Sequence, residues 1–117
     1  MASYELELRE TDIGDVALVA LAGELDLTNA AELERRLADI AHESSGLVLD
    51  LNRVLFLDSA ALHVLFRVAR RFEHEQKRFA VVFQPSAVVA RTLEIVGLHQ
   101  AMRVGPTLDD VLGELEP

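Results

Sequence analysis

Two polar side chains, Asp58 and Ser59, stand together at the point where an apolar run meets a helix-like run. The apolar run RVLFL leads into them, and the run ALHVLFRVARRF follows shortly after them. Both residue types are good helix N-caps, and a serine hydroxyl can also carry a phosphate. Because free N–H groups and the positive end of the helix dipole lie at a helix N-terminus, the fold tolerates a phosphate there. The pair therefore indicates a helix cap, a phosphorylation site at Ser59, or both.

Other kinds of chemistry have little support in the sequence. No HExxH motif, G-x-S-x-G turn or glycine-rich phosphate loop is present, and there is no cysteine. The histidines are not at metal-ligand spacing and are interpreted as surface or helix-end residues; they are His42, His63, His74 and His99. We therefore predict no catalytic residue, no metal and no cofactor. A further alternative is an enzyme or small-molecule binder that uses the acidic end of the sheet, and detection of nucleotide binding would support it.

Length and charge limit the class of protein further. The chain has 117 residues, half of them hydrophobic and only 5% aromatic, so we expect one domain, residues 1–117, with an aliphatic core. The net charge of −9 argues against nucleic acid and anionic membrane as partners. The first residues, MASYELELRE, show no signal peptide, and the longest apolar run, Val16 to Ala22, is too short for a membrane span. We expect a cytoplasmic protein that does not insert into membranes.

Five strands are predicted around the polar pair. YELELRE, residues 4–10, alternates polar and apolar residues, and residues 16–21 form a second short strand, so the two can pair as a hairpin. LVLDL, residues 47–51, has no amphipathic period and suits a central strand that is covered on both faces. FAVVF, residues 79–83, is another buried strand, and AMRV, residues 101–104, is a short last strand.

Two helices are predicted on either side of the central strand. In the first, Asn29 can cap the helix while Glu32 completes a capping box, and HESSG ends it. Its apolar residues recur at helical spacing on one face; they are Ala30, Leu33, Leu37, Ile40 and Ala41. The second helix runs from Ala60 to about Glu75, directly after Asp58 and Ser59.

Two more helices are predicted in the last third of the chain. PSAVVARTLEIVG reads as one helix with Pro85 near its start and Gly97 at the C′ position. The last helix lies in residues 106–117, where Thr107 and Asp110 have capping-box spacing.

The predicted order is β-β-α-β-α-β-α-β-α, a single α/β domain in which a small, mixed, mostly parallel sheet is flanked by α-helices. Asp58 and Ser59 then lie at the carboxyl end of a strand, where open α/β sheets place their sites. A capping box is not available to them, since Ala61 and Leu62 occupy the positions for its acidic residue.

The chain resembles a known family in several segments that follow in the expected order. GELD, residues 23–26, is followed by a helix, then by LVLDLNRVLFLDSAAL and by RTLEIVGL. This arrangement resembles the STAS-domain proteins, specifically the stand-alone bacterial anti-sigma factor antagonists, over nearly the whole chain. The family fold is a small mixed sheet flanked by helices, in agreement with the elements predicted above.

The resemblance implies a partner-switching function. In the family, an unphosphorylated antagonist binds an anti-sigma factor that is also a serine kinase of the histidine-kinase-like ATPase type, and the sigma factor is released. The kinase then uses ATP to phosphorylate the antagonist, the complex falls apart, and a phosphatase resets it. By position, the resemblance assigns phosphorylation to Ser59. The partner-binding residues that it suggests, with neighbours, are Asp26, Thr28, Asn29, Asp58, Ser59, Ala60, Ala61 and His63.

Two residues depart from the family pattern D-S-[ST]-G-L. Ala60 removes the second hydroxyl, so Ser59 is the unambiguous acceptor, and Ala61 replaces a glycine that would allow close approach of a partner. An alternative function is therefore a non-phosphorylated STAS scaffold or regulatory subunit, for example of a bacterial lipid-transport ABC complex.

Overall fold

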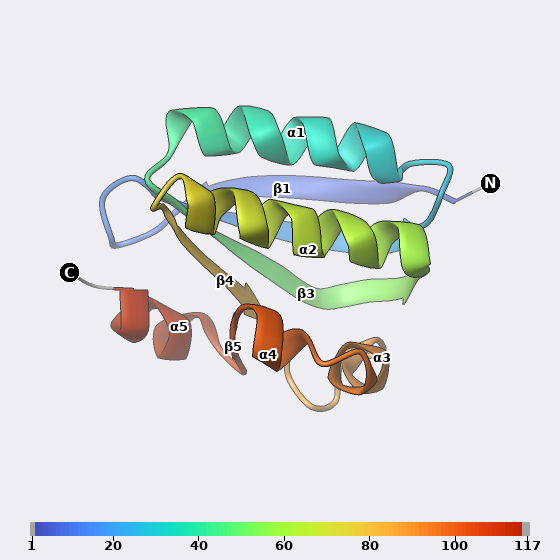
Figure 1. The fold of residues 1–117 in the computed structure, drawn as a ribbon. Coiled ribbons are helices and arrows are strands. Elements are labelled where there is room, and N and C mark those ends of the chain that lie inside the picture. Colours follow the sequence, from blue (N-terminus) through green and yellow to red (C-terminus); the bar gives the residue numbers. More distant parts are fainter. Residues whose placement is uncertain (1, 116–117) are drawn as a thin grey trace.

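A mixed five-stranded sheet forms the centre of the computed structural model, which describes residues 2–115 (Figure 1). The strand order is β1-β2-β3-β4-β5, with β1 antiparallel to β2 and all other neighbours parallel. The strands are β1 (Tyr4–Glu10), β2 (Val16–Leu25), β3 (Gly46–Leu57), β4 (Arg78–Val82) and β5 (Arg103–Gly105). The predicted α/β class and mostly parallel sheet are confirmed.

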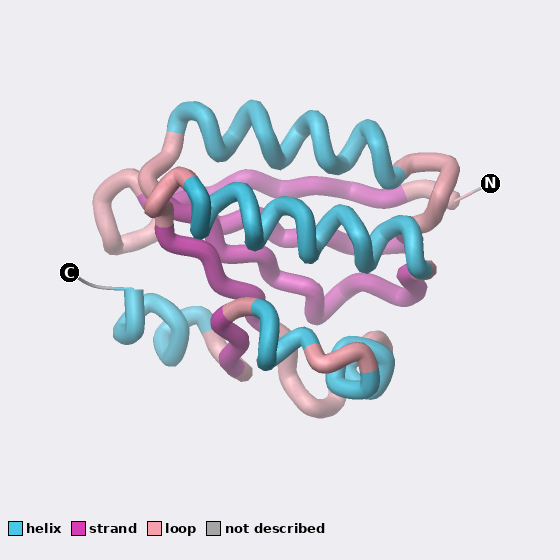
Figure 2. Tube along the Cα trace, in the orientation of Figure 1, coloured by secondary structure: helices cyan, strands magenta, loops and turns pink. Residues whose placement is uncertain are grey.

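Helices cover the two faces of this sheet unequally. Figure 2 shows α1 and α2 side by side along one face, with α3 and α4 near the β4 and β5 edge. The helices are α1 (Ala30–Glu43), α2 (Ser59–His74), α3 (Ala90–Ile95), α4 (Leu98–Ala101) and α5 (Leu108–Leu115). Residues of α5 pack on the opposite face, so the sheet has a helical layer on one side and one short helix on the other.

The core is split by the sheet into two clusters. The larger cluster joins the apolar faces of α1 and α2 to β2, β3 and β4, with Leu33, Leu65 and Phe72 among its fully buried members. Val111 and Leu112 of α5 belong to the smaller cluster on the other face. Each fully buried aliphatic side chain contributes about 1.5–3 kcal/mol. The first half of β3 is covered on both faces, as its lack of an amphipathic period predicts, because Leu47 and Leu49 pack in the larger cluster and Val48 in the smaller one.

β2 and β3 continue beyond their predicted ends. β2 reaches Leu25 rather than Leu21, and β3 reaches Leu57 rather than Leu51. The two strands stay paired through this continuation, with two register shifts between them. β4 pairs only with Gly46 to Asp50 of β3, so the second half of β3 extends past β4. β3 ends at Leu57, directly before Asp58.

Gly23, the glycine of GELD, is required by the backbone geometry at that position. Its φ of 101° lies in a region that side chains rarely adopt, and a Cβ there would lie 2.6 Å from the Ser3 carbonyl oxygen. The next residue, Glu24, donates its N–H to that same carbonyl at 2.9 Å. The glycine therefore lets the end of β2 lie directly against the start of β1.

The predicted single helix over residues 85–97 is wrong in its extent. α3 occupies only Ala90–Ile95, and Gly97 follows at a φ of 74°, which agrees with its predicted C′ position. A separate short helix, α4, comes next because Leu98 is drawn into the core. This helix takes Ala101 out of the predicted last strand, so β5 begins at Arg103.

The start of the last helix is confirmed by its hydrogen bonds. The Thr107 hydroxyl donates to the Asp110 carboxylate at 2.8 Å and accepts the Asp110 N–H at 3.2 Å. α5 runs to Leu115, and the last two residues of the predicted helix, 116–117, lie outside the described residues.

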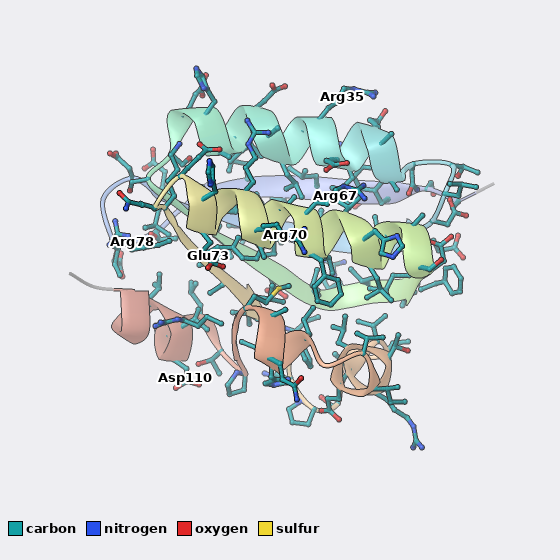
Figure 3. All side chains as sticks on the ribbon, viewed as in Figure 1. Arg35, Arg67, Arg70, Glu73, Arg78 and Asp110 are labelled. Atoms are coloured by element: carbon teal, nitrogen blue, oxygen red, sulfur yellow. The ribbon has the colours of Figure 1, made fainter. Side chains whose placement is uncertain are left out.

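An ion pair ties the two helices of the covered face together. Figure 3 shows Arg67 of α2 between the helices, and its Nε and Nη2 each donate to the Glu34 carboxylate of α1 at 2.9 Å. This bidentate pair lowers the pKa of Glu34 and raises that of Arg67, in both cases chiefly through the side-chain hydrogen bond. The pair adds a polar link between α1 and α2, whose apolar faces already pack in the larger core cluster.

Candidate functional site

Two chain junctions meet at one end of the sheet. Figure 1 shows the β2–α1 connection and the β3–α2 junction together where α1 and α2 begin. The Asp58 N–H donates to the Leu25 carbonyl at 3.2 Å, and the Leu27 N–H donates to Asp58 Oδ2 at 3.0 Å. GELD and DS, which are far apart in the sequence, therefore form one site.

Asp58 caps α2. Its Oδ1 accepts the Ala61 N–H at 3.0 Å, and its backbone is extended, as an N-cap requires. Its Oδ2 is the atom that binds the Leu27 N–H. Of the two candidate caps that the sequence offered, the structure selects Asp58, and the second carboxylate oxygen ties the helix to the neighbouring loop.

Ser59 is thereby left open to solvent. It is the first residue of α2 and is exposed, and its hydroxyl makes no hydrogen bond to another residue in the part of the chain described. Its own N–H and that of Ala60 likewise find no partner within residues 2–115. An exposed hydroxyl therefore stands beside two free N–H donors, an arrangement that suits an anionic group.

Asp26 organises the loop from Asp26 to Asn29, which we call the GELD loop. Its Oδ1 accepts the Thr28 hydroxyl at 2.5 Å and the Thr28 N–H at 2.8 Å. These bonds lower the pKa of Asp26, the hydroxyl contributing most and the backbone N–H next. Asp26 is therefore a charged member of the site at neutral pH, with one oxygen held inside its own loop.

The predicted capping box of Asn29 and Glu32 is not formed. The Asn29 side chain points back toward β2, where Oδ1 accepts the Asp26 N–H at 3.0 Å and Nδ2 donates to the Glu24 carbonyl at 2.9 Å. Glu32 instead accepts the Tyr4 hydroxyl at 2.9 Å. Asn29 still begins the helix by position, but its side chain fastens the GELD loop rather than the first turn of α1.

The remaining predicted site residues lie on the first turns of α2. Ala60 is half-buried, and His63 is exposed one turn beyond Ser59 on the same side of the helix. Ala61 is only 1% exposed, packs in the larger core cluster and gives its N–H to Asp58. Ala61 therefore has no side-chain surface to offer a partner, and its methyl group faces away from the site.

One exposed residue of the site was missed by sequence reasoning. Leu27 lies between two predicted site residues, and its side chain is 78% exposed. In the sequence it continues an alternating pattern after GEL, so it resembles an ordinary strand residue. Only the loop fold shows that it stands in solvent.

The described residues contain neither a metal cluster nor a membrane helix. Among residues 2–115, no three His, Asp or Glu side chains gather closely enough to hold a metal ion. Within the same residues, no helix combines the length and apolar character that a bilayer crossing needs.

Comparison with known proteins places this geometry in a family. Residues 8–111 match the model of the STAS domain. The anti-sigma-F factor antagonist RsfB of Mycobacterium tuberculosis is 35% identical over 102 residues, which cover 86% of this chain and 82% of RsfB.

Solved structures give the same result. An anti-sigma factor antagonist from Mycobacterium paratuberculosis superposes with a TM-score of 0.83 at 30% identity, covering 97% of this chain and 94% of that one. A Thermotoga maritima protein shares the fold, with a TM-score of 0.78 at 21% identity over 94% of this chain and 93% of that one.

Proposed function

The chain belongs to the STAS-domain family, and from this premise we propose that it is an anti-sigma factor antagonist. It binds an anti-sigma factor and so releases the sigma factor that the partner holds. Two similar proteins, from Mycobacterium tuberculosis and Mycobacterium paratuberculosis, carry the antagonist name, and each aligns with most of this chain. The function is binding rather than catalysis, and it takes place in the cytoplasm.

Phosphorylation of Ser59 is the proposed switch, and the open Ser59 hydroxyl is the observation that carries it. A kinase needs an acceptor side chain that is exposed on the substrate protein and can enter the active site of the kinase. Ser59 is exposed and its hydroxyl is not hydrogen-bonded to another described residue, whereas Asp58 takes over the capping role that would otherwise occupy a serine. Ala60 leaves no second hydroxyl beside it.

The charge of a phosphate explains how modification would end binding. A phosphoserine carries roughly −1.5 to −2 charges, and here it would stand directly after Asp58, whose carboxylate binds the GELD loop. One unfavourable contact between the phosphate and a carboxylate of the partner at ~4 Å costs about 4 kcal/mol at an effective dielectric of ~20. Since about 1.4 kcal/mol changes affinity tenfold, one phosphate is enough to dissociate a micromolar complex. The free N–H groups at the start of α2 let the fold itself tolerate the charge.

The partners follow from this chemistry. The ATP-binding and transfer machinery belongs to the anti-sigma factor, a serine kinase of the histidine-kinase-like ATPase type. A phosphatase removes the phosphate and restores binding. The proposed partner-binding surface consists of Asp26, Thr28, Asn29, Asp58, Ser59, Ala60 and His63.

Labelling with ATP tests the proposal. The protein is incubated with a purified candidate kinase and ATP, and mass spectrometry locates the phosphate. We expect one phosphate on Ser59, none on Ser59→Ala, and full labelling of Ser86→Ala, which changes an exposed serine in the β4–α3 connection. Equal labelling of Ser59→Ala would show that the site assignment is wrong.

A Ser59→Asp variant separates the antagonist from the scaffold alternative. An antagonist loses affinity for its kinase when the acceptor position becomes negative, whereas the complex of an ABC-transporter scaffold survives if Ser59 lies outside its interface. Pull-down partners report the same difference, because they are a histidine-kinase-like ATPase in one case and a transporter subunit in the other.

A further inference from the structure

Leu27 is exposed in an unusual way. It is the most exposed of the large apolar side chains among the described residues, with 78% of its surface open. Isolated exposed leucines are common on protein surfaces and need no explanation by themselves. Leu27 differs from them because the surrounding backbone fixes its position, and because it stands at the site of the proposed switch.

The GELD loop holds Leu27 from both sides. The Leu27 N–H is bound by Asp58 Oδ2 at 3.0 Å. Before it, Asp26 is fixed by Asn29 through its N–H at 3.0 Å, and after it, the Thr28 N–H is held by Asp26 Oδ1 at 2.8 Å. The loop therefore presents an apolar side chain on a backbone that is already ordered, which lowers the entropic cost of binding.

The surroundings of Leu27 are acidic. Glu24 and Asp26 precede it in the chain, and Asp58 binds its backbone. Asp26 is ionised at neutral pH, and the Thr28 bonds lower its pKa further. Leu27 is therefore an exposed apolar residue in an acidic segment of the chain.

We propose that Leu27 is the anchor by which the protein docks, inserting into an apolar pocket on the anti-sigma factor. The inference rests on the proposed function and adds to it the residue that supplies binding energy and selects the partner. Buried central anchors dominate the affinity of protein interfaces. Phosphorylation of Ser59 then switches binding off, while Leu27 supplies binding energy.

The test measures binding and phosphorylation of four chains with one purified anti-sigma factor of the histidine-kinase-like ATPase class from the same organism. The chains are the parent, Leu27→Ala, Leu27→Met and Leu8→Ala. Leu8 is the matched control, because it is also a leucine with 56% exposure but lies in β1 opposite Val19, away from the GELD loop.

We expect Leu27→Ala to weaken binding about tenfold or more, while Leu27→Met and Leu8→Ala stay within about twofold of the parent. Phosphorylation of Leu27→Ala by the kinase should show a raised KM with unchanged kcat, since uniform binding is lost and the acceptor is intact. All four chains should unfold at similar denaturant concentrations, because the exposed side chains contribute little to the core.

The outcomes separate the two proposals. If the parent binds and Leu27→Ala binds equally well, the anchor is wrong and the antagonist function stands. If Leu8→Ala weakens binding as much as Leu27→Ala, affinity comes from general surface hydrophobicity and the anchor is also wrong. If the parent neither binds nor is phosphorylated, the proposed function itself fails.

Discussion

Asp58 shows how one residue can serve both the fold and the site. One carboxylate oxygen caps α2 at Ala61, and the other binds the Leu27 N–H in the GELD loop. The residue therefore positions Ser59 without touching the hydroxyl that we propose is modified. Its role is structural positioning, and the proposed switch chemistry belongs to its neighbour.

Replacing Asp58 tests this double role. Asp58→Ala loses both bonds, and we expect a loss of about 1–2 kcal/mol in the free energy of unfolding. Asp58→Asn keeps an oxygen for Ala61, but its amide nitrogen cannot accept from Leu27, so we expect a loss of about 1 kcal/mol. Urea unfolding measures both values, with Asp39→Ala on the exposed face of α1 as the control. Equal stability of Asp58→Ala and the parent would contradict the cap and the tie.

Asp26 gives the site a dependence on pH. Its folded-state pKa lies below the ordinary value, so its contribution to stability is fully present above about pH 3.9 and is lost as the pH falls through the folded pKa. We expect Asp26→Asn to be less stable than the parent at pH 7, and the difference to shrink below about pH 4. Urea midpoints measured across this range test the sign.

A Thr28→Val variant identifies the cause. It removes the hydroxyl donor but keeps the backbone N–H bond to Asp26, so the pKa of Asp26 should move up toward its usual value. If the stability difference between Asp26→Asn and the parent were the same at every pH, the hydrogen bonds from Thr28 would not be what stabilises the ionised Asp26 carboxylate.

Part of the site could be predicted from residue types alone. Asp58 and Ser59 stood out because two polar residues at a strand-to-helix junction have few local uses. The role of Asn29 could not be predicted, because its bonds run back to Glu24 and Asp26 rather than forward into α1. Leu27 was missed because exposure depends on how the loop turns, which no periodic pattern reports.

At the scale of the elements, GELD is mainly a structural motif. Gly23 allows the close approach to Ser3, Leu25 is fully buried, and only the residues from Asp26 onward reach the site. The motif therefore ends a strand and starts a loop at a fixed place. The match of this motif to the family pattern indicates the local backbone geometry more directly than it indicates a binding partner.

Gly23→Ala tests the structural part of the motif. A side chain at a φ of 101° is strained, and the added Cβ would collide with the Ser3 carbonyl, so β1 has to shift. We expect a loss of at least about 2 kcal/mol in the free energy of unfolding. Gly113→Ala is the control, because it adds a methyl group to open space on α5 and should stabilise the helix by up to about 1 kcal/mol. A Gly23→Ala protein as stable as the parent would contradict the contact.

The helices and strands were predictable in kind more than in extent. Long periodic segments such as α1 and α2 repeat an apolar face that the sequence displays directly. β2 and β3 were predicted too short because tertiary pairing carries them through polar residues with register shifts. α4 was not predicted because a four-residue helix is set by the burial of Leu98 rather than by a pattern.

At the scale of the whole molecule, the sheet brings distant segments to one end. β2 and β3 are parallel neighbours, so the loops that follow them emerge side by side, and Leu27 and Asp58 meet across 31 positions of sequence. The α/β class and the mostly parallel sheet could be predicted from the alternation of elements alone. The juxtaposition of the two loops follows from that topology.

The most direct test of the central claim is the affinity of one chain for one anti-sigma factor before and after phosphorylation of Ser59. The unmodified protein and the protein phosphorylated by that kinase, with its single phosphate confirmed by mass spectrometry, are titrated against the partner at fixed ionic strength. The account predicts binding that weakens at least about 100-fold on phosphorylation, while the unfolding midpoint of the free protein changes little. Affinities that agree within about twofold would contradict it, because Ser59 would then not be the switch.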